Sequence, residues 1–215
     1  MPAKPLSTDL VAITTLGLLT ERPRHPYEMQ RLITSRQKTF VRGLPRSLYH
    51  AIDRLSRAGL VVAGETTREG RRPERTVYEI TEAGLEELET WLAALLATPS
   101  RTDPEAFNAA LSLIPYLDEK DALGALRSRV LALEMELAGS IARMQGLRPM
   151  LPRLLMLEEE HRIAMVGAER DYTVALVGEL ESGTITWDRE ALRRMAREGV
   201  ADDDLGRLRE AMGAG

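Results

Sequence analysis

Residues 44–62 read Leu-Pro-Arg-Ser-Leu-Tyr-His-Ala-Ile-Asp-Arg-Leu-Ser-Arg-Ala-Gly-Leu-Val-Val, and this stretch decides the fold. Leu48, Ile52 and Leu55 recur at spacings of four and three, which is the pattern of one buried helix face. The leading proline suits the start of a helix, and Gly59 suits its end. The final Leu-Val-Val favours a β-strand. The stretch therefore predicts a helix that passes through a glycine turn into a strand.

Two shorter helical patterns precede this stretch. Ser7 or Thr8 is expected to cap a helix that runs to about Thr20, because small hydroxyl side chains are favoured caps. His25 and Pro26 begin the second helix, since proline is favoured in a first helical turn. Three short helices in succession are typical of a helix-turn-helix core.

A hairpin is predicted after the third helix. Two β-favouring runs, residues 60–62 and 76–80, flank a polar tip at 64–75 that contains Gly and Pro. A hairpin in this position is a wing, and arginines at its tip could contact phosphates or a minor groove. The alternative is an ordinary solvated loop. The arginines assigned to DNA are Arg71, Arg72 and Arg75.

The charge of the chain is unevenly distributed. Residues 1–75 carry 14 Lys and Arg against 7 Asp and Glu, whereas residues 76–215 carry 15 and 26, for a net charge of −4 overall. A basic head on an acidic body suggests that the head contacts a polyanion.

Three segments carry a resemblance to a known family. They are Leu-Gly-Leu-Leu at 16–19 with His-Pro-Tyr-Glu-Met at 25–29, Ser-Leu-Tyr-His-Ala-Ile-Asp-Arg-Leu at 47–55 with Gly-Leu-Val at 59–61, and Gly-Arg-Arg-Pro-Glu-Arg-Thr-Val-Tyr-Glu-Ile-Thr-Glu-Ala-Gly at 70–84. In this order and spacing they resemble the PadR family of bacterial winged-helix regulators. The resemblance implies repression of transcription, a helical C-terminal dimerisation domain, and regulation by a small molecule, often aromatic, or by a cellular signal.

The chain departs from the pattern of that family at three positions. It has Pro26 where family members usually have Gly, Arg46 where they favour Gly, and His50 where they often have Pro. The last two positions lie on the expected DNA-reading surface. The operator sequence therefore cannot be transferred from a relative.

The first turn of the third helix is predicted to read DNA. Recognition helices contact base edges through their N-terminal residues, which selects Arg46, Ser47, Tyr49 and His50. Arginine can bond to guanine, and the other three can reach phosphates or base edges. Tyr49 has an equally plausible role in packing against the wing or the second helix.

The fold class is predicted to be mainly α with a small β-hairpin wing. Residues 1–97 form a winged helix-turn-helix domain with a linking helix capped by Thr81, and residues 104–183 form a helical dimerisation domain. Residues 184–215 add a short helix and a tail that is partly flexible after Gly199.

Two long amphipathic segments, 118–146 and 153–181, have the three-and-four spacing of coiled coils. We expect them to form a homodimer, because a helix-turn-helix reads paired half-sites. The alternative is a helical hairpin within one chain. The residues assigned to dimerisation are Leu123, Leu126, Val130, Leu133, Leu137, Ile163, Val166 and Val177.

Other classes of protein have little support. The chain has no cysteine, no nucleophilic triad and no phosphate-binding loop, so no enzyme activity, metal or cofactor is predicted. Glu158 and His161 have the spacing of helical di-iron sites, but such sites need a second copy and further carboxylates. There is no leader and no membrane-spanning stretch, which predicts a cytoplasmic protein.

The sequence thus predicts a DNA-binding transcription regulator that acts as a homodimer on an inverted-repeat operator. Double-stranded DNA and a second copy of the chain are the expected partners. A small-molecule effector of unknown identity is also expected, and Trp91 could line its cavity, although a tryptophan at such spacing is more often core. The alternative is a winged-helix module that binds proteins instead of specific DNA.

Overall fold

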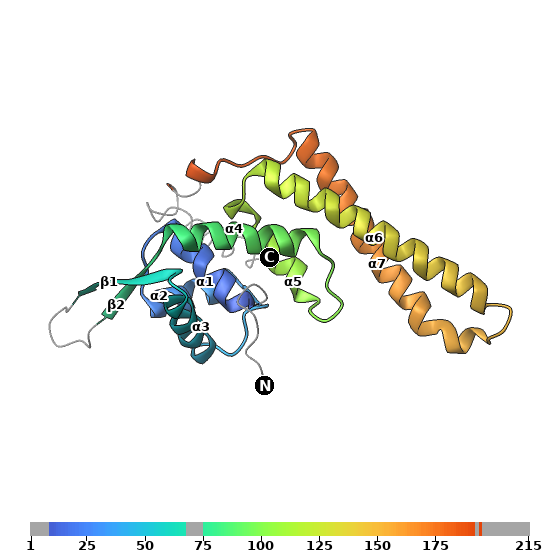
Figure 1. The fold of residues 1–215 in the computed structure, drawn as a ribbon, viewed down its shortest axis with the longest axis horizontal. Helices are drawn as coiled ribbons and strands as arrows, with labels where there is room; N and C mark the ends of the chain where they lie inside the picture. Colours follow the sequence, from blue (N-terminus) through green and yellow to red (C-terminus); the bar gives the residue numbers. More distant parts are fainter. Residues whose placement is uncertain (1–8, 68–74, 192–193, 195–215) are drawn as a thin grey trace, which may run out of the picture. The chain divides into compact units, whose positions relative to one another are not determined.

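The computed structural model describes residues 9–67, 75–191 and 194, and it is mainly helical with one antiparallel hairpin (Figure 1). The chain forms two compact units. The head unit comprises residues 1–92, 103–118 and 187–215, and the hairpin unit comprises residues 93–102 and 119–186. In the described ranges, no helix is long and apolar enough to cross a bilayer.

The helices and strands follow the predicted order. The elements up to the second unit are α1 (Leu10–Glu21), α2 (Pro26–Ser35), α3 (Arg46–Arg57), β1 (Val61–Thr67), β2 (Arg75–Ile80), α4 (Glu82–Ala97), α5 (Glu105–Leu113) and the 3₁₀ turn η2 (Ile114–Tyr116). They are followed by α6 (Glu119–Leu147), the 3₁₀ turn η3 (Arg153–Met156) and α7 (Leu157–Glu181). The predicted fold class, mainly α with a hairpin wing, is confirmed.

The central helix of the head unit is α1, which is buried along almost its whole length. Its cap differs from the prediction. The carboxylate of Asp9 accepts hydrogen bonds from the backbone N–H groups of Val11 and Ala12, at 3.0 and 3.4 Å. Ser7 and Thr8, the predicted caps, lie outside the described residues. Asp is as good a cap as Ser or Thr, so composition alone could not choose among the three.

The wing is attached at its base to both neighbouring helices. Its two strands pair from Val61 with Ile80 outward, and Tyr78 also exchanges two backbone hydrogen bonds with Arg24, at 3.0 and 2.9 Å. Thr81 fixes the start of α4, as predicted, because its hydroxyl accepts from the N–H of Gly84 at 3.0 Å. The same hydroxyl donates to the carbonyl of Gly59 at 2.8 Å, which joins the end of α3 to the start of α4.

The compact units divide the chain differently from the predicted domains. Residues 103–118 belong to the head unit, where the buried side chains of Phe107 and Leu113 form part of the core and α5 packs on α1. A Cβ on Gly17 would lie 2.8 Å from the Tyr116 ring, so the two segments approach closely. The Pro- and Ser-rich stretch at 98–104 is a loop, as its composition indicates, but the head unit resumes after it.

The hairpin unit is built on the packing of α6 against α7 within one chain. This is the alternative that the sequence left open. Of the residues assigned to dimerisation, Leu126 and Leu133 are buried within the chain. The half-buried ones are Leu123, Val130, Leu137, Ile163, Val166 and Val177. The chain itself therefore covers much of the surface that the sequence analysis assigned to a second copy.

Polar side chains cross the hairpin unit at two levels. The side chain of Arg129 is 2% exposed and donates to Glu169 at 2.8 Å and to the carbonyls of Leu95 and Leu96 at 3.1 and 3.2 Å. Nearer the hairpin tip, Arg162 donates to Glu136 and to the buried Ser140, at 2.8 and 2.5 Å. These bonds fix the register of the two long helices.

Candidate nucleic-acid interface

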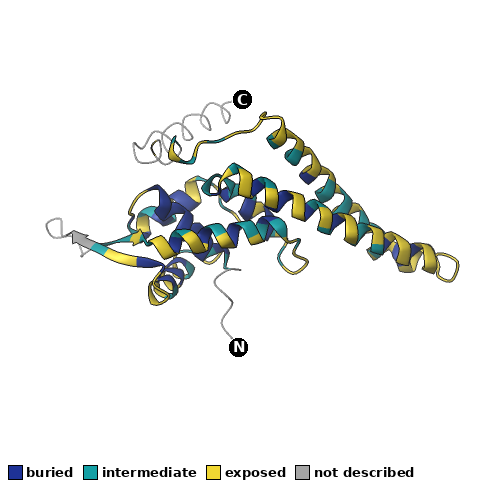
Figure 2. Cartoon of the chain, turned by 45° about the horizontal axis from the view of Figure 1, so that its top comes forward, coloured by how far each residue is buried: buried dark blue, intermediate teal, exposed yellow. Residues whose placement is uncertain are grey.

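Helix α3 has one buried face and one exposed face (Figure 2). Leu48, Ile52 and Leu55, the three residues that the periodicity selected, are at most 3% exposed. They anchor α3, which packs against α1 and β1. The opposite face is open to solvent and begins with Arg46, Tyr49 and His50.

Two of the predicted DNA-reading residues contact each other. Arg46 and His50 are one helical turn apart, and the Nε of Arg46 donates to the Nε2 of His50 at 3.3 Å. Both side chains are exposed, so they form a small polar platform on the first turn of α3. Tyr49 lies beside them and is 53% exposed, which excludes a role for its whole ring in the core.

Ser47 holds the start of α3 in place. Its hydroxyl donates to the carbonyl of Arg42 at 2.7 Å, across a turn in which Gly43 adopts a φ of +74°. The hydroxyl oxygen can still accept a bond, but its proton is already committed to the fold. Ser47 therefore positions the turn that presents Arg46.

Other charged residues lie on and near α3 that the sequence analysis did not assign to DNA contact. Arg54 forms an ion pair with Asp9, so the carboxylate that caps α1 also holds the recognition helix. Arg57 pairs with Asp53 one turn away, which offsets an acidic charge on the exposed face. Arg42 precedes the helix and is exposed. Its position in a loop gave no periodic signal.

The wing is described only in part. Arg71 and Arg72 lie outside the described residues. Arg75 begins β2, where its backbone is opposite Thr67. Strand β2 begins within one residue of the predicted position, but β1 continues to Thr67, inside the stretch that the sequence analysis assigned to the polar tip.

A buried ionic cluster connects the base of the wing to α1 and α2. The side chain of Arg24 is fully buried and pairs with Glu21 at the end of α1. It also donates to the carbonyl of Leu18 at 3.1 Å and to Glu28 at 2.8 Å. Because the backbone of Arg24 pairs with β2, this side chain fixes the wing base relative to α1 and α2.

Glu21 is the centre of that cluster. Arg36 donates to it at 2.6 and 3.2 Å, and the hydroxyl of Tyr116 donates at 2.6 Å. Burial by itself would raise the pKa of Glu21. The hydrogen bond and charge of Arg36, the hydrogen bond of Tyr116 and the charge of Arg24 outweigh burial and hold that pKa below its ordinary value. Burial also raises the pKa of Tyr116, which keeps its hydroxyl a donor.

The residues weighed for a metal site lie on α7. His161 and Glu158 are exposed. Across the part of the chain that the structure describes, no three His, Asp or Glu side chains converge in a way that could hold a metal ion.

A three-helix core, a paired wing and an exposed, arginine-bearing third helix define a winged helix-turn-helix protein. This is a class that places its recognition helix in the major groove of DNA. Residues 15–90 match the model of the transcriptional regulator PadR-like family, so this part of the chain is similar to the members of that family. The description of that family is that of transcriptional regulators.

Solved structures of the same family also match. Bacillus subtilis PadR in complex with operator DNA is 17% identical with a TM-score of 0.38, over 79% of this chain and 98% of that chain. The same protein in complex with p-coumaric acid is 15% identical, with a TM-score of 0.36 over 80% and 99%. A PadR-like regulator from Bacillus cereus is 18% identical, with a TM-score of 0.36 over 80% and 99%. No curated protein matches the chain.

Proposed function

We propose that this protein is a repressor that binds an inverted-repeat operator as a homodimer, with α3 in the major groove. The observation that carries the proposal is the division of α3 into a buried face and an exposed first turn that carries Arg46, Tyr49 and His50. A guanidinium and an imidazole at this position can donate to guanine O6 and N7 or to phosphates. The wing arginines, Arg71, Arg72 and Arg75, are assigned to the DNA backbone or minor groove.

The homodimer is supported by apolar surface that the hairpin unit leaves exposed. Helix α6 has an outward stripe at spacings of four, three and four, formed by Leu131, Met135, Ala138 and Ala142. Helix α7 has another at spacings of three, four and three, formed by Met165, Ala168, Tyr172 and Ala175. Such stripes are typical of helices that pack against further helices. We assign them to the contact with a second copy, with the half-buried residues beside them other than Ile163, which lines a cavity against α6.

The dimer in turn determines the form of the operator. Two identical heads related by a two-fold axis read two inverted half-sites, whose centres are separated by about 10 bp or a multiple of it. We further propose that a small-molecule effector modulates this binding. The tryptophan considered as part of an effector cavity, Trp91, is 8% exposed and belongs to the core.

Selection of bound duplexes from a random pool with the full-length protein tests the proposal. We expect an enriched sequence with dyad symmetry, and a promoter that carries it should lose activity when the protein is present. Enrichment of a sequence without a dyad would contradict the symmetric dimer. Failure to enrich any sequence would instead favour the winged-helix module that binds proteins.

A further inference from the structure

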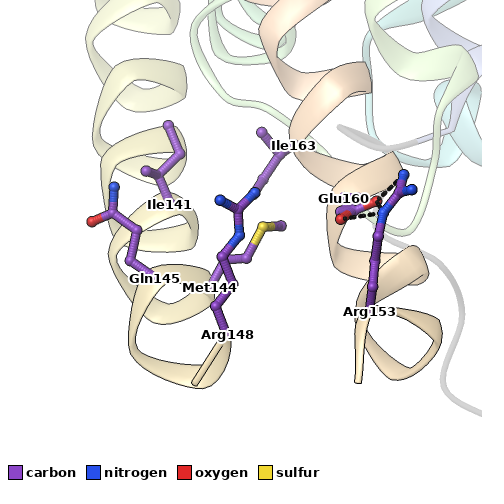
Figure 3. Close-up of a pocket in the computed structure, with 7 residues that line it drawn as sticks. All are labelled: Ile141, Met144, Gln145, Arg148, Arg153, Glu160 and Ile163. Carbon is purple, nitrogen blue, oxygen red and sulfur yellow. Dashed lines mark hydrogen bonds and ion pairs between the residues drawn. The ribbon is translucent and has the colours of Figure 1, made fainter. Parts of the chain in front are cut away.

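A cavity of about 480 Å³ lies in the hairpin unit, where the last turns of α6 face the first half of α7 (Figure 3). Its volume is within the range of small-molecule sites. Its apolar wall is formed by Ile141 and Met144 of α6 and by Ile163 of α7. Met144 is 7% exposed and Ile141 is 43% exposed, so the wall reaches from the core of the hairpin to its surface.

The polar side of the cavity has an excess positive charge. Arg153 and Glu160 pair with each other through hydrogen bonds of 3.1 to 3.2 Å. The hydrogen bond from Arg153 holds the pKa of Glu160 below its ordinary value. The two side chains therefore form a pair in which Glu160 is an ionised carboxylate and Arg153 a charged guanidinium. The remaining charge is Arg148, in the turn directly after α6.

Arg148 is directed into the cavity. Figure 3 shows its guanidinium in the space between the two helices, apart from the Arg153–Glu160 pair. Among the residues that the structure describes, no ion pair or hydrogen bond of this guanidinium is found, although its charge helps the Arg153 hydrogen bond to lower the pKa of Glu160. A guanidinium beside apolar side chains matches a ligand that has a carboxylate at one end and an apolar body at the other.

We propose that this cavity binds a small amphipathic carboxylate, with its carboxylate on Arg148 and its apolar body against Ile141, Met144 and Ile163. One negative charge on the ligand balances the excess positive charge of Arg148, Arg153 and Glu160 taken together. The site lies in the hairpin unit, so ligand binding there can be measured independently of DNA binding by the head.

Calorimetric titration of the full-length protein with 2-naphthoate and with decanoate tests the proposal. We expect saturable binding of at least one of these probes at one site per chain, and the matching uncharged amide should bind about tenfold more weakly or worse. R148Q should weaken binding of the carboxylate by a similar factor without weakening binding of the amide. I141Q, at a partly exposed wall position, should weaken both.

R127Q is the matched control, because Arg127 is an exposed arginine of α6 that pairs with Glu181 instead of lining the cavity. It should leave binding of both probes unchanged. Absence of saturable binding by either carboxylate would overturn the proposal, as would binding that R148Q and I141Q leave unchanged. A loss of the dimer in R148Q, measured by light scattering without added ligand, would instead assign the cavity to a second copy of the chain and would also overturn it.

Discussion

The guanidinium of Arg24 is completely buried and lies against the carboxylate of Glu21, the last residue of α1. Arg36 and Tyr116 contact the same carboxylate, so one acidic group compensates much of the positive charge in the head core. Burying a guanidinium without its partner is costly, which makes Glu21 a sensitive position.

E21Q should therefore destabilise the protein by about 3–5 kcal/mol at neutral pH, because it leaves buried arginines uncompensated. The pKa of Glu21 is lowered in the folded state, so its stabilising contribution is present above the ordinary value of 4.5 and is lost as the pH falls through the folded pKa. The difference in unfolding free energy between wild type and E21Q should shrink accordingly in acid. Urea denaturation from pH 7 downward measures it, and E87Q, at an exposed carboxylate of α4, should show little difference at any pH.

Gly84 is required because α4 closely approaches Leu60, which lies between α3 and β1. A Cβ at this position would lie 2.1 Å from the carbonyl oxygen of Leu60, a backbone atom that cannot easily move. G84A should lower the free energy of unfolding by about 1–3 kcal/mol or more. G124A places the same methyl group in open space on α6, where alanine is the better helix former. Thermal melts that show equal losses for the two variants would contradict this account.

Arg46 is predicted to choose bases. R46A should reduce the difference in binding free energy between operator and random DNA by about 1–3 kcal/mol, the value of a bidentate base contact. R57A is the control at the other end of α3, where Arg57 pairs with Asp53, and it should keep that difference. Fluorescence titrations with both duplexes measure it. An R46A protein with full discrimination would remove Arg46 from base reading.

Arg72 is predicted to contact the backbone of the DNA from the wing. R72A should weaken binding to operator and random DNA alike, and the slope of log affinity against log salt should flatten by about one. R127A removes an exposed arginine of the hairpin unit instead and should leave the slope unchanged. If R72A loses only discrimination, the wing reads sequence and not phosphate.

Met135 is predicted to lie in the contact between two copies. It is 69% exposed in the single chain, so M135E should leave folding intact while it places a charge in the dimer contact. Light scattering at micromolar concentration should show a dimer for the wild type and a monomer for M135E. M150E changes an equally exposed methionine that lies outside both stripes, and it should remain a dimer. Operator affinity should fall with the dimer, since two linked heads bind more tightly than one.

Local patterns in the sequence were sufficient to predict the helices of the head unit and their buried faces. The spacing of Leu48, Ile52 and Leu55 identified the buried face of α3, and Thr81 and Pro26 marked helix starts correctly because caps act over a few residues. The cluster around Glu21 could not be found in this way. Tyr116 is 95 positions from Glu21, and no local period connects them.

The hairpin unit shows the other limit of sequence patterns. Periodicity identified the apolar faces of α6 and α7, but a three-and-four spacing is the same whether the partner helix belongs to the same chain or to another. The exposed stripe at Met135 was missed because alanines contribute half of it and weaken its apolar signal. Similarly, no local pattern indicated that α5 packs on α1. That contact depends on the close approach of Gly17 in α1 to the ring of Tyr116, which follows α5.

The two faces of α3 also bear on how such a regulator can diverge. The contacts that fold the helix use its buried leucines and isoleucine, the Ser47 hydroxyl and the Arg54–Asp9 pair. Arg46, Tyr49 and His50 take part in none of them. Mutations at these three positions can therefore alter the preferred operator with little loss of stability, so new target genes can be acquired by drift at the surface while the scaffold stays unchanged.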